Sequence, residues 1–319
     1  MHWFWSLAAL LLLAAAPAGR SLTPLAVTAT PVALDESDPA RGQVGRLRYL
    51  GGLVLASPDP RFGGVSGLRW VEGRLLAVTD GGNWVSLSLA EDGDRLVGLA
   101  SAEIGLIRGP QRQPLKGKAH ADAEALESDE AGLSVAFERD HRIWRYRDPN
   151  AGAWAEPFPD EAWLKSLPPN AGIEAMARWG RTWQFYAAET RLADGRPDGV
   201  LAGLHGMARA YGHVAVPVPK GFRPTDAEAL DARHIVLLSR RKGIVSGDAA
   251  VVQIVPVDAA RLALGVPDEV GRLEAPLTVD NMEGLAIRRA GARVFLYLVS
   301  DDNFSPLQRT LLMKFELLP

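Results

Sequence analysis

Short apolar stretches separated by polar turns run through most of the sequence and predict a protein built from β-strands. Ser66–Val71 and Arg74–Thr79 are a clear pair, joined by the tight turn Glu72-Gly73. Runs of this length, bounded by glycine and acidic residues, are typical of antiparallel hairpins. Only Asp160–Leu167 and Asp258–Leu264 are assigned to short helices. The pattern favours an all-β fold.

A five-residue pattern of small residue, carboxylate, small residue and apolar residue returns along the chain. Its copies are Asp122–Leu126, Gly172–Met176, Asp226–Leu230 and Asn281–Leu285, with Gly64–Leu68 as a version that lacks the acid. They lie roughly 50 to 58 residues apart, a period that indicates the blades of a β-propeller. Five blades are favoured and six are possible. The last blade is one strand short. Residues 43–56 are predicted to form two short strands, Arg46–Leu50 and Leu53–Ala56, joined at Gly51-Gly52, and these are expected to close the ring against the C-terminal blade.

The N-terminus predicts export. The apolar run Leu7–Ala16 is followed by Ala16-Pro17-Ala18, which is typical of a secretory signal peptide, although no Lys or Arg precedes the run. The run is too short to cross a bilayer, and no other segment is long and apolar enough to do so. We therefore assign residues 1–18 to a signal peptide, 19–42 to an extended arm and 43–319 to one propeller domain. The expected location is the periplasm or the exterior.

Composition narrows the classes of function. The net charge of −3 argues against a nucleic-acid-binding protein, which would show a basic stripe. The absence of cysteine excludes disulfides, thiol nucleophiles and zinc sites with cysteine ligands. With 47% hydrophobic residues the chain can build a core without disulfides, and we expect a monomer.

The repeated acids are expected to meet at one mouth of the propeller channel. In each blade the innermost strand follows the channel and the second strand returns beside it, so the start of one and the end of the other share a rim. This places the motif glutamates with the acids that follow the second strands: Glu124, Glu174, Glu228 and Glu283 with Asp80, Glu138, Glu189 and Asp301. Crowded carboxylates raise one another's pKa and need a compensating cation.

Two kinds of compensation are open, and they can coexist. A divalent cation, with Ca²⁺ as the first choice, binds oxygen ligands in number; arginines could also interleave with the acids. The predicted metal ligands are Asp80, Glu124, Glu174, Glu228, Glu283 and Asp301. Glu138 is the candidate general base, with Arg139 and Arg240 as clamps for an anionic substrate. The candidate substrate contacts are Ser66, His141, Arg309 and Asp302. The alternative is that these side chains only tie the blades together or lie on the surface.

Several motifs resemble one family of exported proteins. They include Gly63–Leu68, Ala136–Ile143 and Ser300–Ser305, in addition to the four acidic copies of the repeat. In their order and spacing they resemble the phytase-like family, described as esterase-like activity of phytase. The resemblance implies a propeller fold, export and a hydrolase. Propeller phytases, which are similar in architecture, use calcium and acidic residues to hold phosphates.

The sequence contains no Gly-x-Ser-x-Gly elbow, His-Glu-x-x-His, Walker loop or dinucleotide fingerprint. A serine-triad esterase is therefore disfavoured. The favoured function is a metal-dependent hydrolase that acts on a small anionic substrate, a phosphate or carboxylate ester, with a lactone as a further possibility. The alternative is a non-catalytic propeller that binds a small ligand, a glycan or a protein partner.

Overall fold

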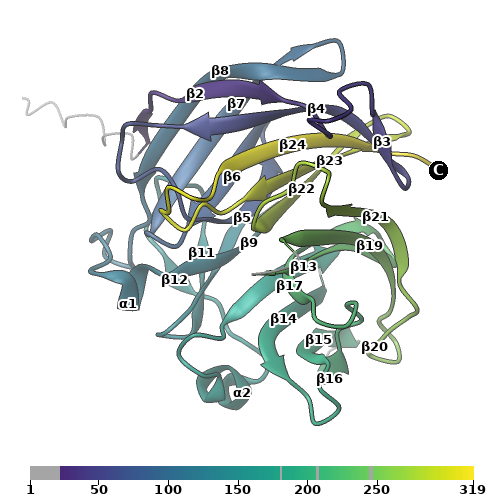
Figure 1. The fold of residues 1–319 in the computed structure, drawn as a ribbon. Coiled ribbons are helices and arrows are strands. Elements are labelled where there is room, and N and C mark those ends of the chain that lie inside the picture. Colours follow the sequence, from purple (N-terminus) through teal and green to yellow (C-terminus); the bar gives the residue numbers. More distant parts are fainter. Residues whose placement is uncertain (1–21, 180–181, 206–207, 244–246) are drawn as a thin grey trace, which may run out of the picture.

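The computed structural model describes residues 22–179, 182–205, 208–243 and 247–319. Five antiparallel sheets are arranged in a ring, which makes the protein a five-bladed β-propeller (Figure 1). The favoured number of blades is confirmed and the six-bladed alternative is wrong. The predicted signal peptide lies outside the described residues.

The first four blades follow one another along the chain. Blade 1 contains β5 (Val65–Val71), β6 (Arg74–Thr79), β7 (Asn83–Asp92) and β8 (Arg95–Leu106), with the short β1 (Thr23–Pro24) at its edge. Blade 2 contains β9 (Ala123–Asp129), β10 (Gly132–Phe137), β11 (Arg142–Tyr146) and β12 (Trp154–Ala155). Blade 3 contains β13 (Ile173–Trp179), β14 (Trp183–Arg191), β15 (Pro197–His205) and β16 (Ala208–Ala215). Blade 4 contains β17 (Arg223–Asp231), β18 (His234–Arg241) and β19 (Ala249–Asp258), on which β20 (Ala263–Leu264) and β21 (Asp268–Glu274) pair.

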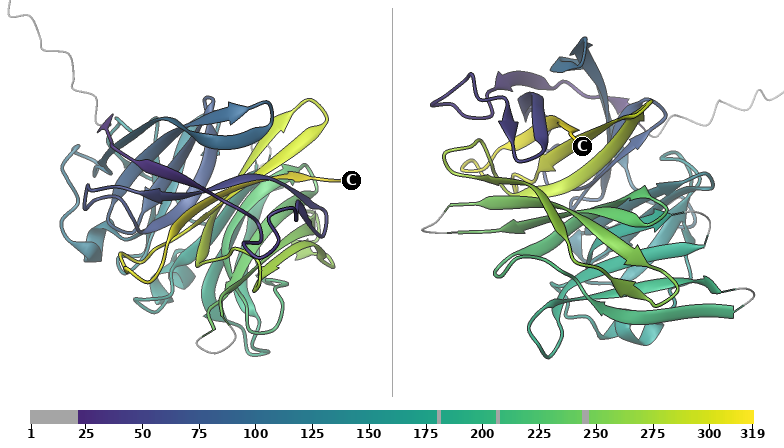
Figure 2. Two further views of the ribbon diagram at one scale, coloured as in Figure 1. Left: turned by 45° about the horizontal axis from the view of Figure 1, so that its top comes forward. Right: turned by 90° about the vertical axis from the view of Figure 1, so that its right-hand side faces the viewer.

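Blade 5 joins the two ends of the described chain. It contains β22 (Met282–Ala290), β23 (Arg293–Ser300) and β24 (Thr310–Leu317), followed by β4 (Leu47–Ala56) and β2 (Thr28–Val32), with β3 (Gln43–Val44) on β4. Figure 2 shows the purple N-terminal strand beside the yellow C-terminal strands, and β4 pairs antiparallel with β24. The predicted closure of the ring is confirmed.

The closing strand differs from its sequence-based assignment in one respect. Gly51-Gly52 was expected to form a turn between two short strands, but β4 runs through both residues. Gly51 has φ +118°, and a Cβ there would lie 2.4 Å from the carbonyl oxygen of Leu96 in blade 1. The glycine is needed because the backbones of two blades approach closely at this point.

The described part of the chain contains two short helices outside the sheets. In α2 (Glu161–Ser166) the N-cap Asp160 accepts a hydrogen bond from the amide of Trp163 at 3.0 Å, which agrees with the predicted helix. The second predicted helix, Asp258–Leu264, is wrong: this segment turns and pairs through β20 with the end of β19. The other helix is α1 (Lys118–Ala121). Among the described residues, neither helix has the length and apolar content needed to cross a membrane.

The core lies between blades rather than at the centre of the ring. Apolar side chains from facing sheets pack together, as where Leu68 and Leu75 of blade 1 meet Phe295 and Tyr297 of blade 5. The first strands β5, β9, β13, β17 and β22 each contact the next around the ring, and they lie near the middle of the molecule in Figure 1. The channel that these five strands enclose is where polar side chains from all blades can meet.

Candidate functional site

Each first strand carries a β-bulge near its start, at the rim of the channel. In β5 the bulged residue is Ser66, because Val65 pairs with Thr79 while Gly67 pairs with the adjacent Val78. The residues at the same position of blades 2 to 5 are Glu124, Glu174, Thr225 and Glu283. A bulge leaves its extra residue unpaired and re-aims the side chain. Three of the five blades therefore present a glutamate at the same level.

The acids that follow the second strands lie beside these bulges. The amides of Asp80, Glu138, Glu189 and Asp301 donate to carbonyls directly before the first strands, those of Gly64, Asp122, Gly172 and Asn281. The ends of the second strands therefore lie beside the starts of the first strands at one rim, as predicted. We call the acids of this rim the acidic collar: Asp80, Asp122, Glu124, Glu138, Glu174, Glu189, Glu283 and Asp301.

The register of blade 4 corrects one member of the predicted set. Asp226–Leu230 repeats the residues of Asp122–Leu126, but it begins just after the bulge at Thr225, whereas Asp122 lies two residues before the bulge at Glu124. Glu228 is thereby shifted three residues deeper into the channel. Two nearly identical peptides can take different registers because strand register is set by pairing and burial over the whole sheet.

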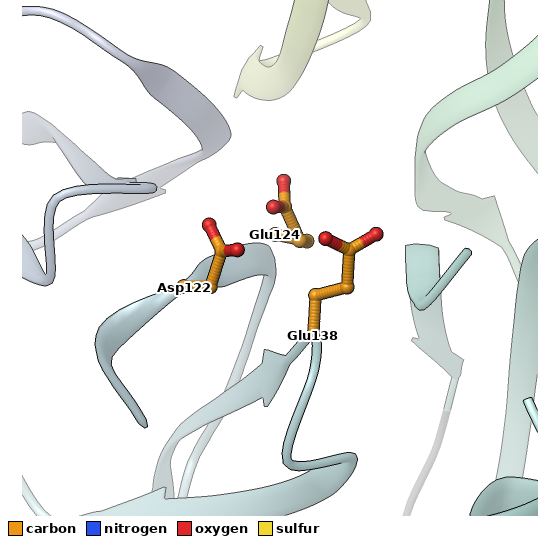
Figure 3. Close-up of side chains that lie close together, drawn as sticks. All are labelled: Asp122, Glu124 and Glu138. Carbon is orange, nitrogen blue, oxygen red and sulfur yellow. The ribbon is translucent and has the colours of Figure 1, made fainter. Parts of the chain in front are cut away.

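Three carboxylates of the collar converge in blade 2. Asp122, Glu124 and Glu138 each offer an oxygen, and these oxygens lie within 4.8 Å of one another. Figure 3 shows the three carboxyl groups pointing toward one another from the start of β9 and the end of β10. Asp122 is fully buried, and its Oδ1 has no hydrogen-bond partner among the described residues. The cluster could hold a metal ion, since hard divalent cations prefer several carboxylate oxygens.

Four acids of the collar, Glu124, Glu138, Glu174 and Asp301, resist ionisation because they are buried close to other carboxylates. Burial and the neighbouring carboxylates raise the pKa of Glu124 and Glu174 well above the ordinary value; Glu124 faces Glu174, and Glu174 also faces Glu189. Burial, with a contribution from nearby acids, also raises the pKa of Glu138 and Asp301 to about 7. A bound cation would relieve this electrostatic strain, because it favours the charged form of each acid.

Basic side chains already compensate part of the charge. Lys118 Nζ lies 2.8 Å from Asp80 Oδ2 and 3.5 Å from Asp122 Oδ1. Arg139 Nε donates to the other carboxylate oxygen of Asp122 at 2.6 Å. On the opposite side of the collar, Arg240 Nε lies 2.7 Å from Glu283 Oε1. Arg240 is mostly buried, while Lys118 and Arg139 are substantially exposed and accessible to a ligand.

The remaining predicted substrate contacts have local partners. Ser66 is buried and its hydroxyl donates to the carbonyl of Gly64 at 3.2 Å. Asp302 accepts from the amides of Gly64 and Phe304 and from Thr310 Oγ1, so it organises the loop after β23.

His141 and Arg309 are not brought to the collar cluster. The ring of His141 is buried against the carbonyl of Pro168, with Nε2 at 3.0 Å. Arg309 lies beside Asp280, with Nε 3.5 Å from Oδ2, and near Glu36. Both side chains connect a loop to its neighbour.

Deeper in the channel, Arg69 forms a hub that sequence reasoning missed. Its guanidinium is fully buried and lies 3.0 Å from both carboxylate oxygens of Asp226 and 3.4 Å from Glu127. It also donates to main-chain carbonyls of four first strands, those of Leu68, Met176, Ala227 and Leu285. With Glu127 in blade 2, a single side chain therefore contacts all five blades.

Glu228 belongs to this inner level. Its Oε2 accepts from the amide of Ile287 at 2.8 Å, and burial raises its pKa to about 8 against the opposing influence of Arg69. We call Glu127, Asp226 and Glu228 the inner acids. Arg69 belongs to no motif, and its only signal in the sequence is a charged residue within an otherwise apolar strand.

Comparisons with known proteins find one matching family and several distant solved structures. A family model, Phytase-like, described as esterase-like activity of phytase, matches residues 60–304. Solved structures with some similarity include GH43B of the Bacteroides ovatus xyloglucan PUL, at 9% identity and TM-score 0.41, covering 81% of this chain and 53% of that one. Another is the PQQ-bound aldose sugar dehydrogenase of Streptomyces coelicolor, at 14% identity and TM-score 0.38, covering 95% and 99%.

This chain thus spans about half the length of GH43B. Similarity at these TM-scores carries no information about activity. Comparison with curated protein sequences gives no significant match.

Proposed function

Since this chain belongs to the phytase-like family, described as esterase-like activity of phytase, we propose that it is an exported, metal-dependent hydrolase of a phosphate or carboxylate ester. The reaction would take place at the acidic collar. The observation that carries the proposal is the convergence of Asp122, Glu124 and Glu138, together with the buried Asp122 oxygen that lacks a hydrogen bond. Such an arrangement is costly for a structural role alone, because three carboxylates brought this close together, one of them fully buried, repel one another even though Lys118 and Arg139 offset part of their charge.

Asp122 and Glu124 would hold the cation, for which Ca²⁺ is the first choice because all the ligands are oxygens. Asp80, Glu174, Glu283 and Asp301 lie on the same collar and would bind it directly or balance its charge. When bound, a divalent cation polarises the ester oxygen and lowers the pKa of a water molecule. The donor set fits this role.

Glu138 is the proposed general base. The amide of Gly172 donates to its Oε1 at 3.3 Å, which fixes the carboxylate at the edge of the cluster. Its pKa, raised to about 7 by burial and by Asp122, suits a group that takes a proton from water near neutral pH. Arg139 is exposed enough to bind an anionic oxygen while it orients Asp122, and Arg240 would balance Glu283 and Glu174.

Two conservative substitutions test the assignment. Glu124→Gln should weaken calcium binding, measured by calorimetry, by about tenfold or more, and lower turnover in proportion at limiting calcium. Glu138→Gln should weaken calcium binding less than Glu124→Gln does, and at saturating calcium it should lower kcat by a factor of about 100 or more on chromogenic phosphate and acyl esters. Glu130→Gln, an exposed acid on the β9–β10 turn, is the control. Unchanged calcium binding and turnover in Glu124→Gln would contradict the proposal.

The rival function is a non-catalytic propeller that binds its ligand at the same mouth. The ion pairs of Lys118, Arg139 and Arg240 favour it, because they show the collar already partly neutralised by the protein itself. An increase in melting temperature with calcium but no turnover on phosphate esters, acyl esters or a lactone would select this rival. Turnover that a chelator abolishes would select the hydrolase.

A further inference from the structure

A large aromatic ring stands exposed at the edge of the acidic collar. Phe304, in the loop between β23 and β24, is 50% exposed, although phenylalanine is ordinarily buried. Its ring lies against Gly63 and Gly64, where an added Cβ would come within 2.9 Å and 2.7 Å of ring carbons. The same added Cβ on Gly64 would lie 2.0 Å from Asp80 Oδ1. The ring edge and a collar carboxylate are therefore direct neighbours.

The chain holds this ring in place with unusual backbone geometry. Asn303 and Phe304 both have positive φ, at 48° and 50°, and so do Gly63 and Gly64 beneath the ring. For phenylalanine this conformation costs roughly 1 to 2 kcal/mol and persists only where its surroundings impose it. Here Asp302 imposes it, since its Oδ1 accepts from the amides of both Phe304 and Gly64.

A residue that only filled space would not need such support. The supported ring presents an open apolar surface next to Asp80, a collar carboxylate that shares Lys118 with Asp122. The collar consists of charged side chains and would take the reacting ester group. The apolar surface of the ring is suited to the part of the ligand that does not react.

We propose that Phe304 is a specificity-determining residue that stacks on a ring in the substrate, so that the enzyme prefers esters carrying an apolar-faced ring over those carrying a short chain. This inference rests on the proposed function for the reaction, but the ring-binding surface itself does not depend on catalysis. An aryl group or the apolar face of a saturated ring would both satisfy it. Stacking of this kind contributes about 0.5 to 1.5 kcal/mol beyond the area buried, which corresponds to about twofold to tenfold in affinity.

The test compares the wild-type protein with Phe304→Asn and Phe304→Leu, both with calcium. Asparagine adopts positive φ readily and removes the ring without disturbing the loop; leucine keeps the apolar character without a flat face. Leu307→Ala removes an apolar side chain that is 92% exposed on the same loop, and serves as the control. Melting temperatures show that each variant is folded.

Binding is measured by calorimetry with phenylphosphonate, cyclohexylphosphonate and methylphosphonate, whose P–C bond an esterase does not cleave. KM is measured with phenyl, cyclohexyl and ethyl phosphate. Phe304→Asn should weaken phenylphosphonate binding and raise the KM for phenyl phosphate by about twofold to tenfold, with methylphosphonate and ethyl phosphate unchanged. The cyclohexyl pair distinguishes a preference for any apolar ring from a preference for aryl groups.

Equal losses for ring and chain ligands, or no loss at all in Phe304→Asn, would overturn the inference even if the protein hydrolyses esters. A second outcome separates the proposed hydrolase function from the ring-binding surface. If no ester is hydrolysed but phenylphosphonate binds in a manner that depends on Phe304, the proposed function fails and the ring-binding surface stands.

Discussion

Replacing Arg69 by methionine removes a side chain that contacts every blade, and the geometry around it indicates how much stability this costs. The substitution keeps most of the buried volume but leaves Asp226 buried without its partner, 3.0 Å from where the guanidinium had been. Removing one member of a buried ion pair costs about 3 to 5 kcal/mol. Four main-chain carbonyls lose a donor as well, each worth about 1 kcal/mol where water cannot replace it.

These contributions are not additive, because Asp226 can take up a proton and water can reach part of the channel. We expect Arg69→Met to lower the free energy of unfolding by about 5 kcal/mol, a third or more of the 5 to 15 kcal/mol of a typical domain. Arg69→Met combined with Asp226→Asn should recover about half of the loss, since the double variant has no isolated buried charge at this position.

The assay is urea unfolding at pH 7 in the presence of a chelator, followed by tryptophan fluorescence, with the midpoint and slope analysed together. Arg233→Met, at an exposed position on the β17–β18 turn, controls for the loss of an arginine as such. If Arg69→Met does not fold, Arg69→Lys should fold with an intermediate loss, because the charge remains but not the reach to five blades. A loss below about 1 kcal/mol, or no recovery in the double variant, would refute the reasoning.

Two further predictions concern the charges of the channel. Burial raises the pKa of Glu127 and Asp226 to about 7 and that of Glu228 to about 8. The folded state therefore favours the protonated forms of these inner acids. The stability that this preference contributes is fully present below the unfolded pKa of about 4 and is lost as the pH rises through 7 to 8. Urea unfolding with a chelator should therefore give a lower free energy at pH 8 than at pH 5, with a smaller difference in Glu228→Gln; a higher value at pH 8 would contradict the assignment. Lys118→Met should raise calcium affinity about fivefold to tenfold in calorimetric titration, because it removes a cation 3.5 Å from Asp122 Oδ1. Lys116→Met, at an exposed position two residues before α1, should leave the affinity unchanged, and an equal affinity in both variants would show that Lys118 does not compete with the metal.

The sequence by itself determined the architecture and the location of the acids. The returning pentapeptide marked five first strands, and the antiparallel return within each blade is a matter of local geometry. Glu124 and Glu138, though separated along the chain, could therefore be placed together from the repeat alone. The closure of the ring followed from a missing strand at one end and an unassigned strand at the other, which pair as β24 and β4.

Only the tertiary structure decided the register and the long-range partners. Thr225 occupies the position assigned to Glu228, because the pairing of β17 with β18 shifts a repeated peptide by three residues. Lys118 reaches Asp80 from the first residue of α1, which belongs to no motif, and Arg69 finds its partners on four other strands. A side chain's neighbours across a closed ring depend on how five sheets pack and twist together, and that information is spread over the whole chain rather than contained in any one segment.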